Sequence, residues 1–341
     1  MSWQFPKYIC SFLRRHRNKF IFTGVFIGGV IGSLKFAEYK IKQYLEDEQK
    51  KTLVNRKRQR SLEQVHVHSV SLTQSMLQSI MNEVIKAANT EVITEKLKTS
   101  HENKIGLWNE LKVTIFTRIV SGIFSVVAVI VVLRVQFLQL AAAMANNGSK
   151  LSDDEQKQIL ATCHDHLMET GIDKLSKILS NTTQTVTESM PLQCLVTHRS
   201  ILTTLQSITS RLMVKDGPTN SFRVTDFTFS EHVLDKVNDT NIRSSILQTL
   251  DILDSPDCER VFVQCVAKGI DLLGSQMCDA MSSASSSDSV EMNLLPLAKC
   301  LPLLNSQLKY ICSAQFVQQV SESPLLARFS NNVFDSFEDN L

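Results

Sequence analysis

The sequence predicts an all-α fold with one transmembrane anchor near the N-terminus. Three observations lead to this prediction. No proline occurs between Pro6 and Pro191, so long helices can form without interruption. Apolar residues recur mainly at helical spacing, and no segment alternates convincingly with the period of a strand. An uncharged apolar run over residues 20–34 follows a cluster of basic residues, which is typical of a membrane anchor.

Composition sets the broad class. The chain has 341 residues, of which 43% are hydrophobic, enough for one large domain or two small ones with a sizeable core. Its 36 Lys and Arg nearly balance 34 Asp and Glu, and the net charge of +2 argues against nucleic acid as the main partner. The 8 cysteines form no CxxC pair and lie mostly within apolar helical patterns. We therefore expect reduced core thiols and a cytosolic environment.

Residues 1–19 are interpreted as a basic targeting segment and residues 20–36 as the anchor. The targeting cations are Arg14, Arg15, Arg17 and Lys19. A helix over residues 20–34 spans about 22 Å, which is shorter than the roughly 30 Å hydrocarbon core, but flanking lysines can snorkel to the interface. A cleaved signal peptide and a mitochondrial signal anchor are alternatives. Cations on both sides leave the orientation of the anchor open.

The anchor carries glycine at every fourth position, which places these glycines on one helix face. Such a face allows close approach of a second helix in the bilayer, so self-association is one interpretation. The other is that glycine is simply frequent in membrane helices. The three residues are Gly24, Gly28 and Gly32.

Residues 37–60 are strongly charged and are predicted to form a solvated stalk, followed by a helical-bundle domain over residues 61–341. The basic run at residues 56–60 is either a solvated helix face or a phosphate-binding patch. Ser61 and Gln64 resemble a capping box, which predicts a new helix start there. That helix is expected to end near Asn89.

A long helix is predicted from Lys104 onward. It contains a second apolar run, residues 119–133, bracketed by Arg118 and Arg134. This run is either a second transmembrane span or a central helix buried in the domain. We favour burial, because the helical pattern continues well beyond both arginines.

Later helix starts follow from local signals. Ser152 and Glu155 form a capping box, and Ser255 and Ser323 each precede a proline at the first helical position. Residues 215–220, 222–229 and 282–289 are predicted loops. A terminal helix is expected to dock on the core through one apolar stripe. The stripe consists of Leu325, Leu326, Phe329, Val333, Phe334 and Phe337.

Signatures of catalysis are missing. The sequence contains no nucleophile elbow, no glycine-rich phosphate loop and no HExxH helix. The best metal candidates share no spacing that completes a ligand set, so we predict no metal site, no cofactor and no catalytic residue. These candidates are Cys163, His164, His166, His66 and His68.

Trp108 is the one residue that invites a binding interpretation. It lies one turn after Lys104, near the start of the long helix, with Leu111 close by. An aromatic residue at a helix end beside a long cation is typical of an interface anchor. A buried core tryptophan is the alternative, and periodicity does not separate the two.

Several motifs resemble the peroxin-3 family of peroxisomal biogenesis factors. The most specific are NKIGLWNELKVTIFTR at residues 103–118 and VVLRVQ at residues 131–136. FLRRHRNK at residues 12–19 is similar to the family's targeting signal, and LPLLN at 301–305 with QFVQ at 315–318 to its last helices.

The resemblance implies an elongated helical bundle facing the cytosol, anchored once in the peroxisomal membrane and in contact with its lipid. Its partner would be the N-terminal amphipathic helix of the chaperone peroxin-19, bound in an apolar groove. By resemblance, Trp108 is the aromatic anchor, Lys104 meets acidic side chains, and Leu97 and Leu111 complete the groove. The alternative function is a two-span membrane enzyme or channel subunit.

The resemblance also places groove residues near the C-terminal end of the long helix. The family often has glycine there, whereas this chain has alanine at residues 141–143. Ala142 and Met144 are the residues expected to contact the partner at this end.

Overall fold

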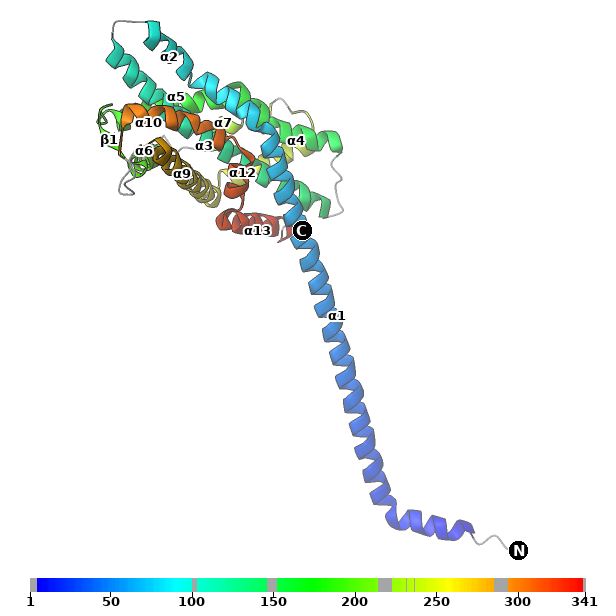
Figure 1. Cartoon of the computed structure of the whole chain (residues 1–341). Coiled ribbons are helices and arrows are strands. Elements are labelled where there is room, and N and C mark those ends of the chain that lie inside the picture. Colours follow the sequence, from blue (N-terminus) through cyan, green and yellow to red (C-terminus); the bar gives the residue numbers. More distant parts are fainter. Residues whose placement is uncertain are drawn as a thin grey trace. The chain divides into compact units, whose positions relative to one another are not determined.

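The computed structural model describes two compact units, Met1–Ser61 and Leu62–Leu341, which are treated separately (Figure 1). The described ranges are 5–99, 103–145, 152–213, 223–230, 232–235, 237–284 and 294–339. Within them, only the backbone is described for residues 5–34, 36, 37, 145, 163, 338 and 339.

The described chain is almost entirely helical, which confirms the predicted fold class. The longer helices are α1 (Phe5–Ala87), α2 (Thr90–Thr99), α3 (Lys104–Ala145), α4 (Asp153–His166), α5 (Ile172–Thr187), α6 (His198–Met213), α8 (Thr240–Leu253), α9 (Pro256–Ala284), α10 (Leu297–Ser306), α12 (Ala314–Ser321) and α13 (Pro324–Asp339). The short elements are the π-helical turn η1 (Leu167–Gly171), α7 (Thr225–Thr228), α11 (Leu308–Ile311), β1 (Leu195–Val196) and β2 (Leu295–Pro296).

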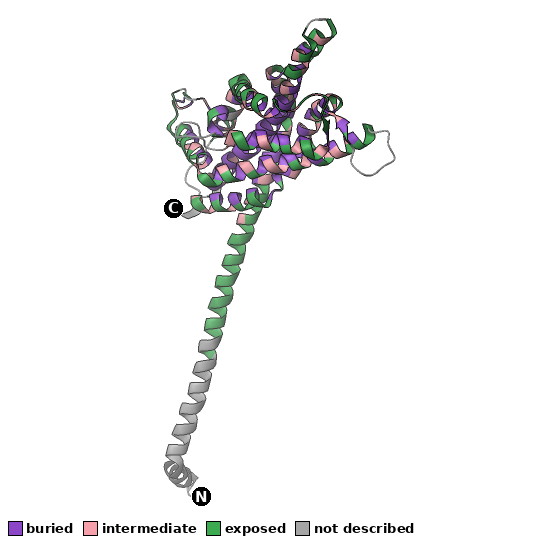
Figure 2. Ribbon diagram, turned by 90° about the vertical axis from the view of Figure 1, so that its left-hand side faces the viewer, coloured by how far each residue is buried: buried purple, intermediate pink, exposed green. Residues whose placement is uncertain are grey.

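In the first unit, the backbone of α1 is helical from Phe5 onward. Its described side chains are exposed from residue 38 to residue 57, as the charged composition predicts (Figure 2). The targeting cations and the three anchor glycines lie where only the backbone is described, so their side-chain roles stay predictions.

The predicted helix start at Ser61 is wrong, because α1 passes through it without interruption. Lys, Arg, Gln and Leu dominate the preceding turns, and their high helix propensity continues the helix through the apparent capping box. The expected end near Asn89 is confirmed. The Asn89 side chain there accepts hydrogen bonds from the backbone N–H groups of Glu91 and Val92, which caps α2.

The second unit is built around α3. This helix packs against α2, α5, α8, α9, α10 and α13. Among the described residues, α3 is the helix long and apolar enough to cross a membrane, yet its whole apolar stretch is buried inside the domain. Figure 2 shows the buried residues gathered within this unit. The predicted buried central helix is confirmed, and the packing contradicts a second span at residues 119–133.

Local capping signals predict the later helix starts correctly. At the start of α4, Ser152 N donates to Glu155 Oε2 at 2.5 Å and Glu155 N donates to Ser152 Oγ at 3.3 Å, which forms the expected capping box. Helix α9 begins at Pro256, and Ser255 Oγ accepts from Cys258 N at 3.2 Å. Helix α13 begins at Pro324.

Four local predictions need correction. The predicted loop at 222–229 contains the short helix α7, and β1 and β2 form a two-residue antiparallel pair. Both depend on tertiary partners, which a local pattern does not contain. In the terminal stripe, Leu325 is 41% exposed, whereas Leu326, Phe329, Val333 and Phe334 are buried. The predicted loop at 282–289 begins too early, because residues 282–284 still belong to α9. Residues 285–289 and 215–220 of the predicted loops lie outside the described residues.

Candidate helix-binding groove

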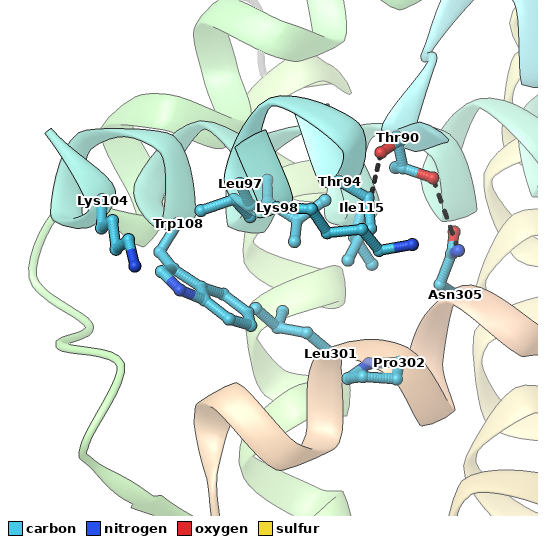
Figure 3. Close-up of a pocket in the computed structure, with 11 residues that line it drawn as sticks. Thr90, Thr94, Leu97, Lys98, Lys104, Trp108, Ile115, Leu301, Pro302 and Asn305 are labelled. Carbon is cyan, nitrogen blue, oxygen red and sulfur yellow. Dashed lines mark hydrogen bonds between the residues drawn. The ribbon is translucent and has the colours of Figure 1, made fainter. Parts of the chain in front are cut away.

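A cavity of about 450 Å³ lies at the N-terminal end of α3 (Figure 3). Helices α2 and α3 form one side of it and α10 forms the other. Its lining residues are Thr90, Thr94, Leu97, Lys98, Lys104, Trp108, Leu111, Ile115, Leu301, Pro302 and Asn305.

The start of α3 is fixed by Asn103. This residue has φ of 55°, in the left-handed region that asparagine tolerates better than most residues. Its carbonyl then accepts the backbone hydrogen bond of Leu107 at 3.1 Å, which begins the helix. A Cβ at Gly106 would lie 2.6 Å from Asn103 Oδ1, so the glycine leaves room for this side chain. This turn therefore determines where α3 begins and so which side of the helix carries Lys104 and Trp108.

One face of α3 supplies the apolar floor. Lys104, Trp108, Leu111 and Ile115 follow one another at spacings of three or four residues and so lie on one side of the helix. Leu111 and Ile115 are 7% and 2% exposed. Trp108 is half-buried and packs against the core, while its indole extends toward Leu301 and Pro302 of α10 (Figure 3). Trp108 is thus neither a fully buried core residue nor a free surface residue.

The rim of the groove is basic. Lys98 and Lys104 line it and are exposed, and no carboxylate lines it among the residues that the structure describes. An apolar cavity with an aromatic wall and two exposed cations suits an amphipathic helix that carries acidic residues.

The inner end of the groove is polar. Thr90 is 3% exposed, and its Oγ1 accepts from Asn305 Nδ2 at 3.5 Å. The Thr94 hydroxyl donates to the Thr90 carbonyl at 2.7 Å. The contact between Asn305 and Thr90 links α2 to α10 behind the apolar floor, whereas the Thr94 hydrogen bond lies within α2.

Four of the six predicted contact residues meet in this groove, namely Leu97, Lys104, Trp108 and Leu111. Ala142 and Met144 do not line this cavity, and their contact with the partner stays a prediction. Because α3 is continuous, Met144 lies about 54 Å beyond Trp108 along the helix axis at about 1.5 Å per residue. Ala142 is 3% exposed, and Met144 is 70% exposed at the far end.

Sequence reasoning missed the wall formed by α10. Leu301, Pro302 and Asn305 lie within one of the resembling motifs, but nothing in that motif indicates that it faces Trp108. Ile115 was also missed, although it continues the helical spacing from Leu111.

The candidate metal ligands whose side chains are described are not brought together, and the side chain of Cys163 lies outside the described part of the structure. His66 Nδ1 is 2.7 Å from Arg134 Nη2, and the ring of His68 stacks on Phe137 with centroids 6.1 Å apart. His164 Nδ1 lies 3.1 Å from a carboxylate oxygen of its neighbour Asp165. In the described part of the chain, no group of three or more His, Cys, Asp or Glu side chains is arranged to hold a metal ion.

The described part of the chain is a helical bundle with an apolar, basic-rimmed groove at the N-terminal end of α3. No protein-family model matches the chain. It is 27% identical to Peroxisomal biogenesis factor 3 of Homo sapiens over 363 residues, which covers 96% of this chain and 97% of that protein. The proteins of the same name from Bos taurus and Mus musculus are 26% and 25% identical, with 96% of each chain covered. These end-to-end homologues support the peroxin-3 family that the sequence motifs indicated.

Proposed function

We propose that the chain is a docking receptor of the peroxisomal membrane, which binds the N-terminal amphipathic helix of peroxin-19 and so supports peroxisome biogenesis. The observation that carries this proposal is the half-buried Trp108 in an apolar groove rimmed by lysines. A role in peroxisome biogenesis is also what the names of its homologues describe.

The groove suits recognition of a helix. Its buried floor is already formed, so a partner needs to displace little protein structure to enter. A volume of about 450 Å³ accommodates one or two large apolar side chains projecting at helical spacing from the partner. Lys98 and Lys104 can then contact carboxylates on the partner's flanks. These exposed cations contribute more to association rate and specificity than to affinity.

The N-terminal segment completes the proposal. Residues 20–36 would hold the protein in the peroxisomal membrane by a single pass, and the basic residues 14–19 would direct it there. The helical domain would then face the cytosol, where a soluble chaperone can reach the groove.

Trp108→Ala tests the proposal. Removing a half-buried interface aromatic is expected to weaken binding by about 2 to 4 kcal/mol, a factor of roughly 30 to 1,000 in the dissociation constant. We would measure the affinity of a labelled peroxin-19 helix for the full chain in detergent by fluorescence anisotropy, with thermal unfolding of each variant in parallel.

Ile178→Ala is the matched control, because Ile178 is an apolar side chain that is 52% exposed on α5 and does not line the groove. Its affinity for the peptide should equal that of the unmodified chain. Unchanged affinity in Trp108→Ala together with a marked drop in melting temperature would refute the docking role and identify Trp108 as a core residue.

A further inference from the structure

Arg118 lies directly behind the groove and is almost completely enclosed, with 2% of its surface exposed. It follows Ile115 of the groove floor by one helical turn. Its Nε donates to the carbonyl of Ala88 at 2.7 Å, and Nη2 approaches the carbonyl of Ile85 at 3.5 Å. Ile85 lies in the last turn of α1 and Ala88 directly follows that helix, where backbone carbonyls lack partners within the helix.

The same guanidinium also binds the two walls of the groove. Nη2 and Nη1 donate to the two carboxylate oxygens of Glu91 on α2, at 2.6 and 3.0 Å. Nη1 donates in addition to Asn305 Oδ1 on α10, at 3.2 Å. This two-pronged contact with a carboxylate has the geometry that only a planar guanidinium provides. Consistent with a tight pair, the pKa of Glu91 is lowered, mainly by its hydrogen bond from Arg118.

Each wall is therefore held at a residue that belongs to the groove or adjoins it. Asn305 lines the groove itself, and Glu91 is next to Thr90, which also lines it. Asn305 Nδ2 also donates to Thr90 Oγ1 at 3.5 Å, so α10 and α2 are in direct contact as well. Arg118 thereby connects α2 to α10 beneath the groove floor. Trp108 and Leu301 face each other within the groove (Figure 3).

From this arrangement we infer that Arg118 is a positioning residue, which sets the separation of α2 and α10 and so the width of the groove. The inference deepens the proposed docking function and rests on it for its biological meaning. Arg118 touches no partner. It acts through Glu91 and Asn305, and lysine cannot replace it, because one ammonium group cannot make these planar contacts at once.

The test uses Trp108 as a reporter in the absence of any partner. The sequence has 2 tryptophans, so Trp3→Phe leaves Trp108 as the sole indole in the full chain. In this background we would measure acrylamide quenching and the emission maximum of Trp108 for Arg118→Lys. We expect stronger quenching and a red shift, because a wider groove exposes the ring to water.

The matched control is Arg134→Lys, which changes a second enclosed arginine of α3 that is 3% exposed and does not line the groove. Its Trp108 emission should stay as in the background, even if its melting temperature falls. Equal Trp108 spectra for Arg118→Lys and the background, below the unfolding transition, would overturn the inference, because Arg118 would then act only on stability.

A second variant covers the case in which Arg118→Lys does not fold. Glu91→Gln leaves the arginine in place and removes the carboxylate, whose side chain is 58% exposed, so the fold is expected to survive. It should increase Trp108 quenching, whereas Glu95→Gln on the exposed face of α2 should not. No change in Glu91→Gln would likewise count against the inference.

Peptide binding separates this inference from the docking proposal. For a peroxin-19 helix, Arg118→Lys is expected to weaken binding by about 2- to 30-fold. If the unmodified chain fails to bind the peptide, docking is refuted. The Trp108 spectra still decide whether Arg118 positions the walls.

Discussion

The two halves of α3 each contain a buried arginine, but the two arginines lie in different surroundings. Arg118, in the N-terminal half, pairs with the carboxylate of Glu91 and lies beneath an open groove. Arg134, in the C-terminal half, donates from Nε to Ser69 Oγ at 3.1 Å and lies 2.7 Å from His66 Nδ1. Across the described ranges, no ion pair with a carboxylate is found for Arg134. Arg118 thus connects the two walls of the candidate groove, whereas Arg134 connects α1 to α3.

The charge of Arg134 is poorly compensated. Burial lowers the pKa of Arg134 to about 10. The pKa of His66 is lowered as well, first by burial and second by the positive charge of Arg134, with Glu322 opposing the shift. His66 is therefore neutral at pH 7, and its unprotonated Nδ1 accepts the arginine N–H.

The largest expected effect on the free energy of unfolding comes from replacing each arginine in turn by methionine. Arg118→Met leaves the carbonyl of Ala88 and the amide of Asn305 without their donor, and should lower the free energy of unfolding by about 3 kcal/mol. Arg134→Met removes an uncompensated cation and leaves neutral partners, so about 1 kcal/mol or less is expected. Chemical unfolding followed by circular dichroism compares the two. Equal losses of unfolding free energy in the two variants would contradict the difference between the two arginines.

Ala142→Leu tests the far end of the helix. Ala142 is 3% exposed, so added side-chain volume should lower the free energy of unfolding by about 1 to 3 kcal/mol. Because Ala142 lies far from Trp108, affinity for a peroxin-19 helix should not change. A loss of affinity with unchanged stability would instead support a contact site at the C-terminal end of α3.

A smaller effect on stability is expected when a change of pH alters the protonation of His66. Its pKa in the folded protein is lower than the unfolded value of 6.5, so the unfolded chain binds more protons as the pH falls below 6.5. Stability from this group is complete above pH 6.5 and decreases as the pH falls toward the lowered pKa. Relative to the unmodified chain, His66→Asn should show a shallower loss of melting temperature between pH 7.5 and 5.5. Parallel curves for the two proteins would contradict this role of His66.

Much of the fold follows from local sequence signals. Capping serines before proline or three residues before glutamate place the starts of α4, α9 and α13, because those interactions involve only neighbouring residues. The apolar run of α3 predicts a buried helix. The signal at Ser61 fails because the flanking residues favour helix just as strongly, and α7 and the β1–β2 pair depend on distant segments.

The site is predicted only in part. The face of α3 around Trp108 follows from helical spacing and from the family resemblance, but the opposing wall at Leu301 and Pro302 comes from a segment far along the chain. The pairing of Arg118 with Glu91 was missed for the same reason, since the arginine looked like the boundary of an apolar run. Ala142 and Met144 do not line the cavity around Trp108, because a motif does not indicate where along a continuous helix a groove ends, and their contact with the partner stays a prediction.

Site-specific photo-cross-linking compares the two ends of α3 most directly. A p-benzoylphenylalanine replaces Thr94, an exposed residue that lines the groove, in one variant and Met144, exposed at the far end, in another. Each full-length variant is mixed with peroxin-19, irradiated and analysed by mass spectrometry. Docking in the groove predicts a covalent adduct with the N-terminal helix of peroxin-19 from position 94 and none from position 144. An adduct from position 144 but not from position 94 would contradict it.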